Sequence, residues 1–396
     1  MKKSELFAFL MIIFIGCSSM SSNQTEVKKD RIVLGAEQLD QYVPQLGKKN
    51  VALLVNQTST IGNVHLVDTL QALGVNIKKV FAPEHGFRGD HSAGAVVKNG
   101  LDKKTGLPVV SLYGKNKKPT PEMLANIDVI IFDIQDVGVR FYTYISTMHY
   151  LMEACAEQGK ELIILDRPNP NGFYIDGPVL QKEYTSFIGM HPIPIVHGLT
   201  VAELALMIQG ESWLKNEIKC NFSIVPCKNY THDSLYQLPI KPSPNLPNMN
   251  SVYLYPYLGL FEGTNVSIGR GTQTPFQIVG RPGFEGSFSF TPQSMPGISD
   301  HPKYEGKECG GFIVNDAKQN YFFAKPSLNL DWFLLFYKKN TTENGPYFKS
   351  FIFKLMGNSS FKEQVIAGLS ARDIKQTWQP DLLKYKAMRK KYLLYP

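Results

Sequence analysis

The segment Val51–Val55, with the sequence VALLV, is a run of five apolar residues. Strands buried on both faces of a parallel sheet have this composition, whereas a strand with one solvated face alternates apolar and polar residues. Residues 64–73 follow with helical spacing and end at Gly74, a residue type that commonly ends helices. The segment therefore predicts a central parallel strand that is followed by a helix.

The same alternation of strand and helix continues outward from this segment. Further apolar runs predict strands at 77–81, 109–112, 128–132 and 161–165. Apolar residues recur with a helical period over 141–158, and a Thr200-x-x-Glu203 capping box predicts the start of another helix. This order is typical of an α/β fold with a doubly wound parallel sheet.

The character of the sequence changes after about residue 212. Prolines and glycines become frequent, short β-like runs occur at 276–279 and 312–314, and the C-terminal part returns to helical spacing. We therefore expect a first domain at residues 32–215 and a second, smaller α+β domain at residues 216–396.

The N-terminal segment has the features of an export signal. Lys2 and Lys3 precede an apolar run at residues 6–15, and Gly16 and Cys17 follow it. A short basic head, an apolar stretch and a small residue at its end predict a secretory signal peptide. No apolar run in the chain reaches the roughly 18 residues that a membrane span requires.

The end of this signal resembles a bacterial lipobox, in which cleavage occurs before a cysteine that then carries lipid. We expect residues 1–16 to be a lipoprotein signal peptide, Cys17 to be lipidated, and residues 17–31 to form a polar tether. The chain is then expected in the bacterial cell envelope, anchored to a membrane by lipid, as a periplasm-facing or outer-membrane lipoprotein. The alternative is an ordinary signal peptide with an incidental cysteine.

Composition and missing motifs exclude several classes of function. Hydrophobic residues make up 43% and charged residues 19% of the 396, so the chain is globular rather than disordered. The net charge of +8 comes from scattered basic residues, and the dense run at 384–391 is interpreted as a solvated helix face. No dinucleotide loop, phosphate-binding loop, zinc-protease motif or Gly-x-Ser-x-Gly motif occurs. We expect no nucleic-acid partner and no cofactor.

Four cysteines follow Cys17, and their spacing matches no metal-binding pattern. They are Cys155, Cys220, Cys227 and Cys309. Cys220 and Cys227 flank a strand-like run, so a disulfide between them is compatible with export but is not required by the spacing.

Polar residues collect where the predicted strands end. The carboxyl ends of parallel strands meet at one edge of the sheet, which is where open α/β sheets bind ligands. The candidates at these ends are Asn56, Glu84, His85, Arg88, Asp133, Gln135, Asp136, Arg140, Asp166, Arg167 and Asn169. We expect them to contribute to one shared site, against the alternative of ordinary caps and turns.

Glu84 is the leading catalytic candidate. It lies just past an apolar strand, and a partly desolvated carboxyl at such a position suits a general acid. Asp133 and Asp136 follow a neighbouring strand, and two carboxylates flanking one bond are what glycoside hydrolysis requires. The alternative for Glu84 is an ion pair with Arg88.

The second half of the chain contributes further candidates. Glu262, Asn265 and Arg270 lie in a glycine-rich stretch whose composition is typical of a substrate-binding loop, although a plain turn between strands is the alternative. Glu262 is a second candidate acid or base, and Arg270 is suited to a bidentate carboxylate contact. His197 ends another strand-like run, and it either faces the same cleft or is a structural histidine.

A metal site is a competing interpretation of the first loop. Glu84, His85, Asp90 and His91 lie within eight residues, and such side chains bind zinc or hard cations. Adjacent residues seldom point at one ion, so we expect no metal.

Four long motifs stand out, and together they resemble one family. They are PEHGFRG at 83–89, FDIQDVGVRFYTY at 132–144, DRPNP at 166–170 and EGTNVSIGRGT at 262–272. The chain is similar, over nearly its whole length, to the exo-β-N-acetylmuramidase (NamZ) family of glycoside hydrolases. The resemblance implies a Rossmann-like domain and a smaller C-terminal domain, with the active site in the cleft between them.

The resemblance also implies an activity, namely release of terminal non-reducing N-acetylmuramic acid from peptidoglycan fragments during cell-wall turnover. The expected substrates are muramyl disaccharides or short glycan ends. The resemblance places the catalytic glutamate at Glu84. We infer that Asp133 or Asp136 assists it and that Tyr142 lies against the sugar ring.

The lactyl carboxylate that distinguishes muramic acid is expected to bind either Arg270 or Arg140, because an unpaired buried arginine would reject a sugar without it. The second catalytic group is either another carboxylate or the acetamido group of the substrate. The alternative function is an envelope sugar-binding lipoprotein without catalysis, and a third is a metallohydrolase. Turnover and sensitivity to a chelator distinguish the three.

Overall fold

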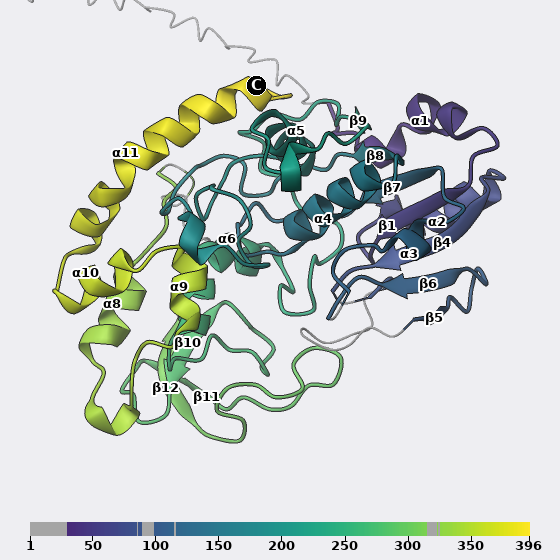
Figure 1. Cartoon of the computed structure of the whole chain (residues 1–396). Helices are drawn as coiled ribbons and strands as arrows, with labels where there is room; N and C mark the ends of the chain where they lie inside the picture. The colour runs from purple at the N-terminus through teal and green to yellow at the C-terminus, as the bar shows by residue number, and fades with distance from the viewer. Residues whose placement is uncertain (1–29, 85, 89–98, 115, 315–322, 324) are drawn as a thin grey trace, which may run out of the picture. The chain divides into compact units, whose positions relative to one another are not determined.

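The central element of the computed structural model is a seven-stranded sheet with the order β5-β6-β4-β1-β7-β8-β9 (Figure 1). Its strands are β1 (Val51–Val55), β4 (Ile77–Ala82), β5 (Gly100–Leu101), β6 (Pro108–Ser111), β7 (Val129–Asp133), β8 (Glu161–Leu165) and β9 (Phe222–Val225). Every neighbouring pair is parallel except β5 with β6. In chain order, the parallel strands are arranged third, second, first, fourth, fifth, sixth. This arrangement confirms the predicted doubly wound α/β fold.

The structure describes residues 30–84, 86–88, 99–114, 116–314, 323 and 325–396. The predicted signal peptide, Cys17 and nearly all of the predicted tether lie outside the described residues, as do His85, Asp90 and His91. Residues Ile32–Pro396 pack as one unit. Within the described part, no helix has the length and apolar character needed to cross a bilayer.

Helices cover both faces of the sheet because alternate strand residues face opposite sides. On β1, Leu54 belongs to the apolar cluster that includes α4 and α5, whereas Leu53 belongs to the cluster that includes α1 and α2. The helices on the two faces are α1 (Leu39–Leu46), α2 (Leu66–Ala72), α4 (Tyr144–Glu157) and α5 (Val201–Gly210), and α3 (Pro121–Leu124) precedes β7. The core is therefore split into two apolar layers with the sheet between them.

Most of the helices and strands that local sequence patterns predicted are present in the structure. The Thr200–Glu203 capping box is present, with the Thr200 N–H donating to Glu203 Oε2 at 2.9 Å. The predicted helix at 64–73 begins later than expected, because the hairpin of β2 (Thr60–Ile61) and β3 (Val64–His65) precedes it. The short edge strand β5 was not predicted. Strand β9 coincides with the strand-like run between Cys220 and Cys227, but it pairs with β8 in the first sheet although it lies beyond residue 215.

The second half of the chain builds a smaller sheet and a group of helices. An antiparallel three-stranded sheet has the order β10-β12-β11, and β10 and β12 overlap the predicted runs at 276–279 and 312–314. The elements are α6 (Met249–Leu258), β10 (Ile278–Arg281), β11 (Phe288–Phe290), β12 (Cys309–Ile313), α8 (Asp331–Lys338), α9 (Phe351–Met356), α10 (Ser360–Ile366) and α11 (Ala371–Arg389). Cys220 and Cys227 are buried free thiols.

Candidate active site

Glu84 lies two residues beyond β4, at the carboxyl edge of the sheet, and is half-buried. Its carboxylate accepts hydrogen bonds from Tyr113 Oη at 3.0 Å and from Thr143 Oγ1 at 3.3 Å. Tyr144 Oη donates to the Glu84 backbone oxygen at 3.4 Å. Burial and the Glu84 charge raise the pKa of Tyr113, so its phenol remains a donor. The carboxylate is thus oriented by groups that follow β6 and begin α4.

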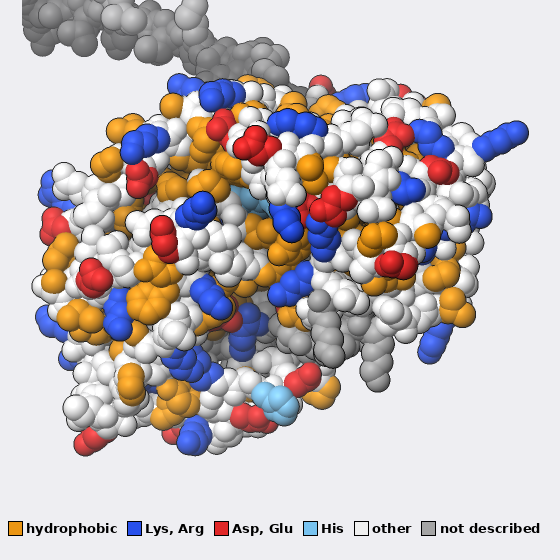
Figure 2. Space-filling model, viewed as in Figure 1, with side chains coloured by type: hydrophobic (Ala, Val, Ile, Leu, Met, Phe, Trp, Pro, Cys, Tyr) orange, Lys and Arg blue, Asp and Glu red, His pale blue; other side chains and the backbone are white. Residues whose placement is uncertain are grey.

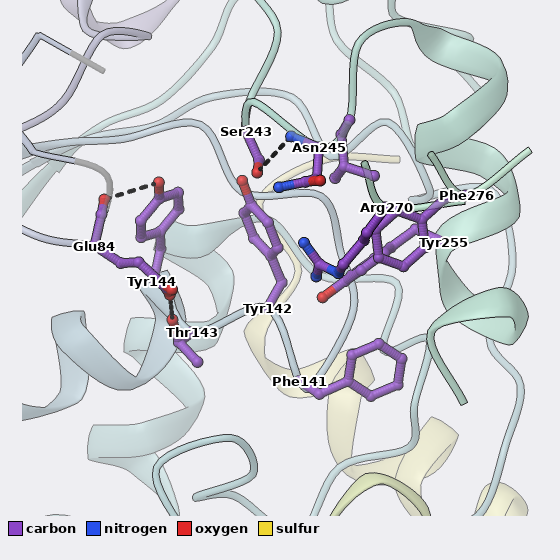
Figure 3. Close-up of a pocket in the computed structure, with 11 residues that line it drawn as sticks. Glu84, Phe141, Tyr142, Thr143, Tyr144, Ser243, Asn245, Tyr255, Arg270 and Phe276 are labelled. Atoms are coloured by element: carbon purple, nitrogen blue, oxygen red, sulfur yellow. Dashed lines mark hydrogen bonds between the residues drawn. The ribbon is translucent and has the colours of Figure 1, made fainter. Parts of the chain in front are cut away.

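A small space, which we call the inner recess, opens beside Glu84 (Figure 3). Its volume is about 70 Å³. Aromatic rings make up much of its wall, with ring centroids 5.8 Å apart for Tyr142 and Tyr255 and 5.0 Å apart for Tyr255 and Phe276. Its lining residues are Glu84, Phe141, Tyr142, Thr143, Tyr144, Ser243, Asn245, Leu246, Tyr255, Arg270 and Phe276.

A larger space, which we call the outer cleft, adjoins the recess and has a volume of about 540 Å³. Its lining residues are Glu84, Tyr113, Gly114, Lys117, Phe141, Thr143, Ser186, Phe187, Ile188, Tyr255, Glu262, Arg270, Phe351, Lys354 and Leu355. Figure 2 shows a hollow in the molecular surface with lysine and arginine side chains gathered around it. Glu84 and Arg270 line both spaces and therefore lie at their junction.

Arg270 is aimed at this junction by its neighbours in the predicted loop. Gly269 and Gly271 have φ angles of 77° and 81°, which glycine adopts without strain. The Arg270 Nε and Nη2 atoms each lie 2.9 Å from Glu262 Oε1, and the guanidinium lies 4.9 Å from the centre of the Phe276 ring. The structure thus brings three predicted residues of the two halves, Glu84, Glu262 and Arg270, to one cleft.

Asp133 is placed differently from the expectation. Its Oδ1 and Oδ2 atoms accept hydrogen bonds from Arg167 Nε at 2.5 Å and Nη2 at 2.9 Å. Asp133 is fully buried and Arg167 is 3% exposed, and neither lines the inner recess or the outer cleft. A buried charge needs such a partner, so this pair holds the carboxyl edge of the sheet together.

Asp136 is also enclosed in the fold and lines neither space. Its Oδ2 accepts the Gly138 N–H at 2.7 Å and lies 4.0 Å from His197 Nε2. Burial raises the pKa of Asp136 to about 7 and lowers the pKa of His197 to about 3. Both side chains are therefore uncharged in mildly acidic solution.

The raised pKa of Asp136 makes the stability of the fold depend on pH. Well below pH 4 the carboxyl is protonated in both the folded and the unfolded chain. Between about pH 4 and pH 7 it ionises only in the unfolded chain, so stability falls across this range and levels off above pH 7, where the folded chain ionises as well. The Asp136→Asn variant should match the wild type near pH 4 and exceed its stability at pH 8 by on the order of a few kcal/mol. Melting curves at both pH values, with the exposed Asp233→Asn as control, measure this. A difference that is constant with pH would contradict it.

Arg140 is a buried cross-link rather than a residue of the cleft. Its Nη1 donates to the backbone oxygens of Pro178 and Ile193, both at 2.7 Å, and its Nη2 donates to the Leu355 oxygen at 2.8 Å. The side chain is fully buried and lines neither space. Of the two arginines considered for the lactyl carboxylate, only Arg270 reaches the junction.

The remaining predicted residues divide into one that lines the recess and a group held within the fold. Tyr142 lines the recess, and its hydroxyl donates to the Pro242 oxygen at 2.8 Å. Arg88 forms ion pairs with Asp102 at 2.7 Å and with Asp68 at 3.3 Å. Among the described residues, the structure therefore does not show the Glu84–Arg88 ion pair that was the alternative for Glu84. The others with internal hydrogen bonds outside the two spaces are Asn56, Gln135, Asp166, Asn169, His197 and Asn265.

Several lining residues were missed because they belong to segments without a motif. Asn245 lies among Pro242, Pro244 and Pro247, in the part of the sequence where prolines and glycines become frequent, and Tyr255 lies within the mostly buried helix α6. Lys117 and Lys354 resemble ordinary surface lysines in the sequence. The proline cluster around Asn245 was the one available signal.

A metal site receives no support from the described part of the chain, where no three His, Cys, Asp or Glu side chains gather as ligands. His85, Asp90 and His91 lie outside that part. The metal interpretation of their loop therefore stays an untested alternative.

An acid and an arginine beside a cluster of edge-to-face aromatic rings, at the ligand-binding edge of a doubly wound sheet, are features of an α/β carbohydrate-active protein. Comparison with family models is more specific. The model for the N-terminal part of the exo-beta-N-acetylmuramidase NamZ matches residues 51–250, and the model for its C-terminal part matches residues 253–395. The chain belongs to the NamZ family of exo-β-N-acetylmuramidases.

Individual relatives agree with this assignment. The chain is 37% identical to the peptidoglycan beta-N-acetylmuramidase NamZ of Bacillus subtilis (strain 168), over 99% of this chain and 100% of that protein. Two crystal structures of DUF1343 family proteins from Bacteroides fragilis NCTC 9343 are similar, at 44% and 32% identity with TM-scores of 0.85 and 0.77. Each comparison covers 92% of this chain and 99% of the other.

Proposed function

We propose that this chain is an exo-acting β-N-acetylmuramidase that releases N-acetylmuramic acid from the non-reducing ends of peptidoglycan fragments. The observation that carries the proposal is the position of the Glu84 carboxylate at the junction of a narrow recess and a wider cleft, with Arg270 at the same junction. The full-length similarity to a peptidoglycan beta-N-acetylmuramidase supports it.

In this proposal Glu84 is the general acid that protonates the leaving oxygen. Tyr113 and Thr143 hold its carboxylate in place through their hydroxyl groups. Arg270 binds the lactyl carboxylate, and Glu262 orients the guanidinium through its 2.9 Å contacts. N-acetylglucosamine has no lactyl carboxylate, so it cannot make this charge-assisted contact with Arg270, which disfavours it relative to N-acetylmuramic acid.

The second catalytic group is proposed to be either Glu262 or the acetamido group of the substrate. Among the carboxylates of the described residues, Glu84 and Glu262 line the outer cleft. Asp133 and Asp136 are enclosed by the fold and lie outside the recess and the cleft. In this proposal Asp133 and Asp136 stabilise the fold next to the site and do not contact the substrate.

Release of a chromophore from a β-linked N-acetylmuramic acid glycoside tests the proposal. The chain without its predicted signal peptide is incubated with this glycoside and with the matching N-acetylglucosaminide, with and without EDTA. Release from the muramic acid glycoside alone, indifferent to EDTA, is the expected result. A ligand-dependent rise in melting temperature without release would instead favour the sugar-binding lipoprotein.

The location in the cell envelope, and with it a part in cell-wall turnover, is also proposed, on the strength of the lipobox-like segment before Cys17. Wild-type chain expressed in bacteria is expected in the membrane fraction and to incorporate labelled fatty acid. Cys17→Ser removes the only thiol of that segment, so the variant should lose the label and leave the membrane fraction. Identical labelling of the two proteins would overturn the anchor.

A further inference from the structure

We propose that the inner recess receives the acetamido group at C2 of the terminal sugar and that Asn245 is the residue that recognises it. The inference rests on the proposed function and assigns one substituent of the proposed substrate to one part of the site. It makes Asn245 a specificity-determining residue.

The side-chain oxygen of Asn245 is a hydrogen-bond acceptor that no donor of the described residues contacts. Its Nδ2 donates to the Ile298 oxygen at 2.7 Å, which fixes the orientation of the amide and leaves Oδ1 as the remaining polar atom. The residue is 1% exposed, and its Oδ1 has no hydrogen-bond partner among the described residues. Asn245 lines the recess, and an unsatisfied buried acceptor is costly, so a ligand N–H group that reaches Oδ1 would gain a hydrogen bond that the free protein lacks.

The walls of the recess define the rest of that ligand group. Leu246, Tyr255 and Phe276 contribute apolar surface. The recess, at about 70 Å³, is much smaller than the outer cleft, at about 540 Å³, so we assign the sugar ring to the cleft and a short substituent to the recess. An acetamido group combines an N–H donor with a methyl group, which matches the acceptor and the apolar wall. A carboxylate carries no proton for Oδ1, and a hydroxyl leaves the apolar wall without contact.

The order of groups around the site agrees with the order of carbons in the sugar. In Figure 3, Tyr142 and Asn245 lie between Glu84 and Arg270. Carbon C2 likewise lies between C1, which carries the bond to be cleaved, and C3, which carries the lactyl group. A sugar with C1 at Glu84 and its lactyl carboxylate at Arg270 therefore presents its acetamido group to the recess.

The turn that carries Asn245 is held in place before any ligand binds. Tyr142 Oη and Gln57 Nε2 donate to the Pro242 oxygen at 2.8 and 3.0 Å, and the Leu246 N–H donates to the Ser243 oxygen at 3.0 Å. A rigid turn presents the acceptor at little further cost in entropy.

Calorimetric titration of the chain with two sugars tests the assignment. One is N-acetylmuramic acid, and the other is 3-O-lactylglucose, which has a hydroxyl in place of the acetamido group. Asn245→Ala should weaken binding of the first about 10- to 100-fold, as expected for one buried hydrogen bond, and that of the second less than about threefold. Asn250→Ala is the matched control, since Asn250 lies near the turn but outside the recess, and it should change neither affinity.

A second measurement needs no variant and so does not depend on the Asn245–Ile298 contact. N-acetyl-, N-propionyl- and N-butyrylmuramic acid are titrated into the wild-type chain, and affinity should fall with each added methylene because the recess is small. Equal affinities across this series, or an equal loss for both sugars in Asn245→Ala, would overturn the inference. Failure of the wild type to bind or cleave any muramic acid derivative would instead overturn the proposed function.

Discussion

The Glu84→Gln variant should lose nearly all hydrolysis of a β-N-acetylmuraminide, with kcat lowered about 10²- to 10⁴-fold, the range that general acid catalysis supplies. The amide is the same size as the carboxyl group. Tyr113 and Thr143 donate to different carboxylate oxygens of Glu84, so the amide oxygen keeps one of these hydrogen bonds, and the amide NH2 can donate to the other hydroxyl oxygen. The N–H protons of an amide are too weakly acidic to protonate the leaving oxygen. Steady-state rates with the chromogenic glycoside measure the effect.

The control for this variant is Glu285→Gln, the same substitution at an exposed position outside the recess and the outer cleft. It should keep wild-type kcat, and both variants should melt as the wild type does. Near-normal kcat in Glu84→Gln would show that another group protonates the leaving oxygen.

The Arg270→Gln variant should lose the preference for muramic acid. We expect kcat/KM on the muraminide to fall about 10²- to 10³-fold, because a charge-assisted contact is lost. The low rate on the N-acetylglucosaminide should change much less, since that sugar has no lactyl carboxylate. The kcat/KM of Arg270→Lys on the muraminide should lie between those of the wild type and Arg270→Gln, because lysine keeps the positive charge but lacks the planar guanidinium that binds a carboxylate with two hydrogen bonds.

The exposed Arg372→Gln serves as the control for loss of one positive charge. Measuring kcat/KM on both glycosides for each variant separates recognition from general damage. An equal decrease in kcat/KM on the two substrates would show that Arg270 stabilises the fold of the cleft and does not recognise the lactyl group.

Much of the fold was predictable because its signals are local. The apolar run Val51–Val55 and the capping box at Thr200 depend on interactions between residues close in sequence. Strand β1 and the start of α5 are therefore found where they were predicted. The run that forms strand β9 was also visible, but its place beside β8 was not, since that pairing joins segments far apart in the chain.

The candidate site was predictable only as a region. Position at a strand end does not say which way a side chain points, so the sequence placed both Glu84 and Asp133 among the catalytic candidates. In the structure, Glu84 lines the cleft, whereas Asp133 pairs with Arg167 outside it. Glu84 and Arg270 come together only through the packing of the two halves, which no local pattern encodes.

The buried Arg140 guanidinium sets the mechanics of substrate entry. It ties the backbone at Pro178 and Ile193 to Leu355, a residue of the outer cleft wall. Swinging that wall would strip a buried cation of a carbonyl partner, so a hinged, trap-like closure is strongly disfavoured. We therefore expect the part of the cleft wall that carries Leu355 to keep its position relative to Pro178 and Ile193 when a sugar enters.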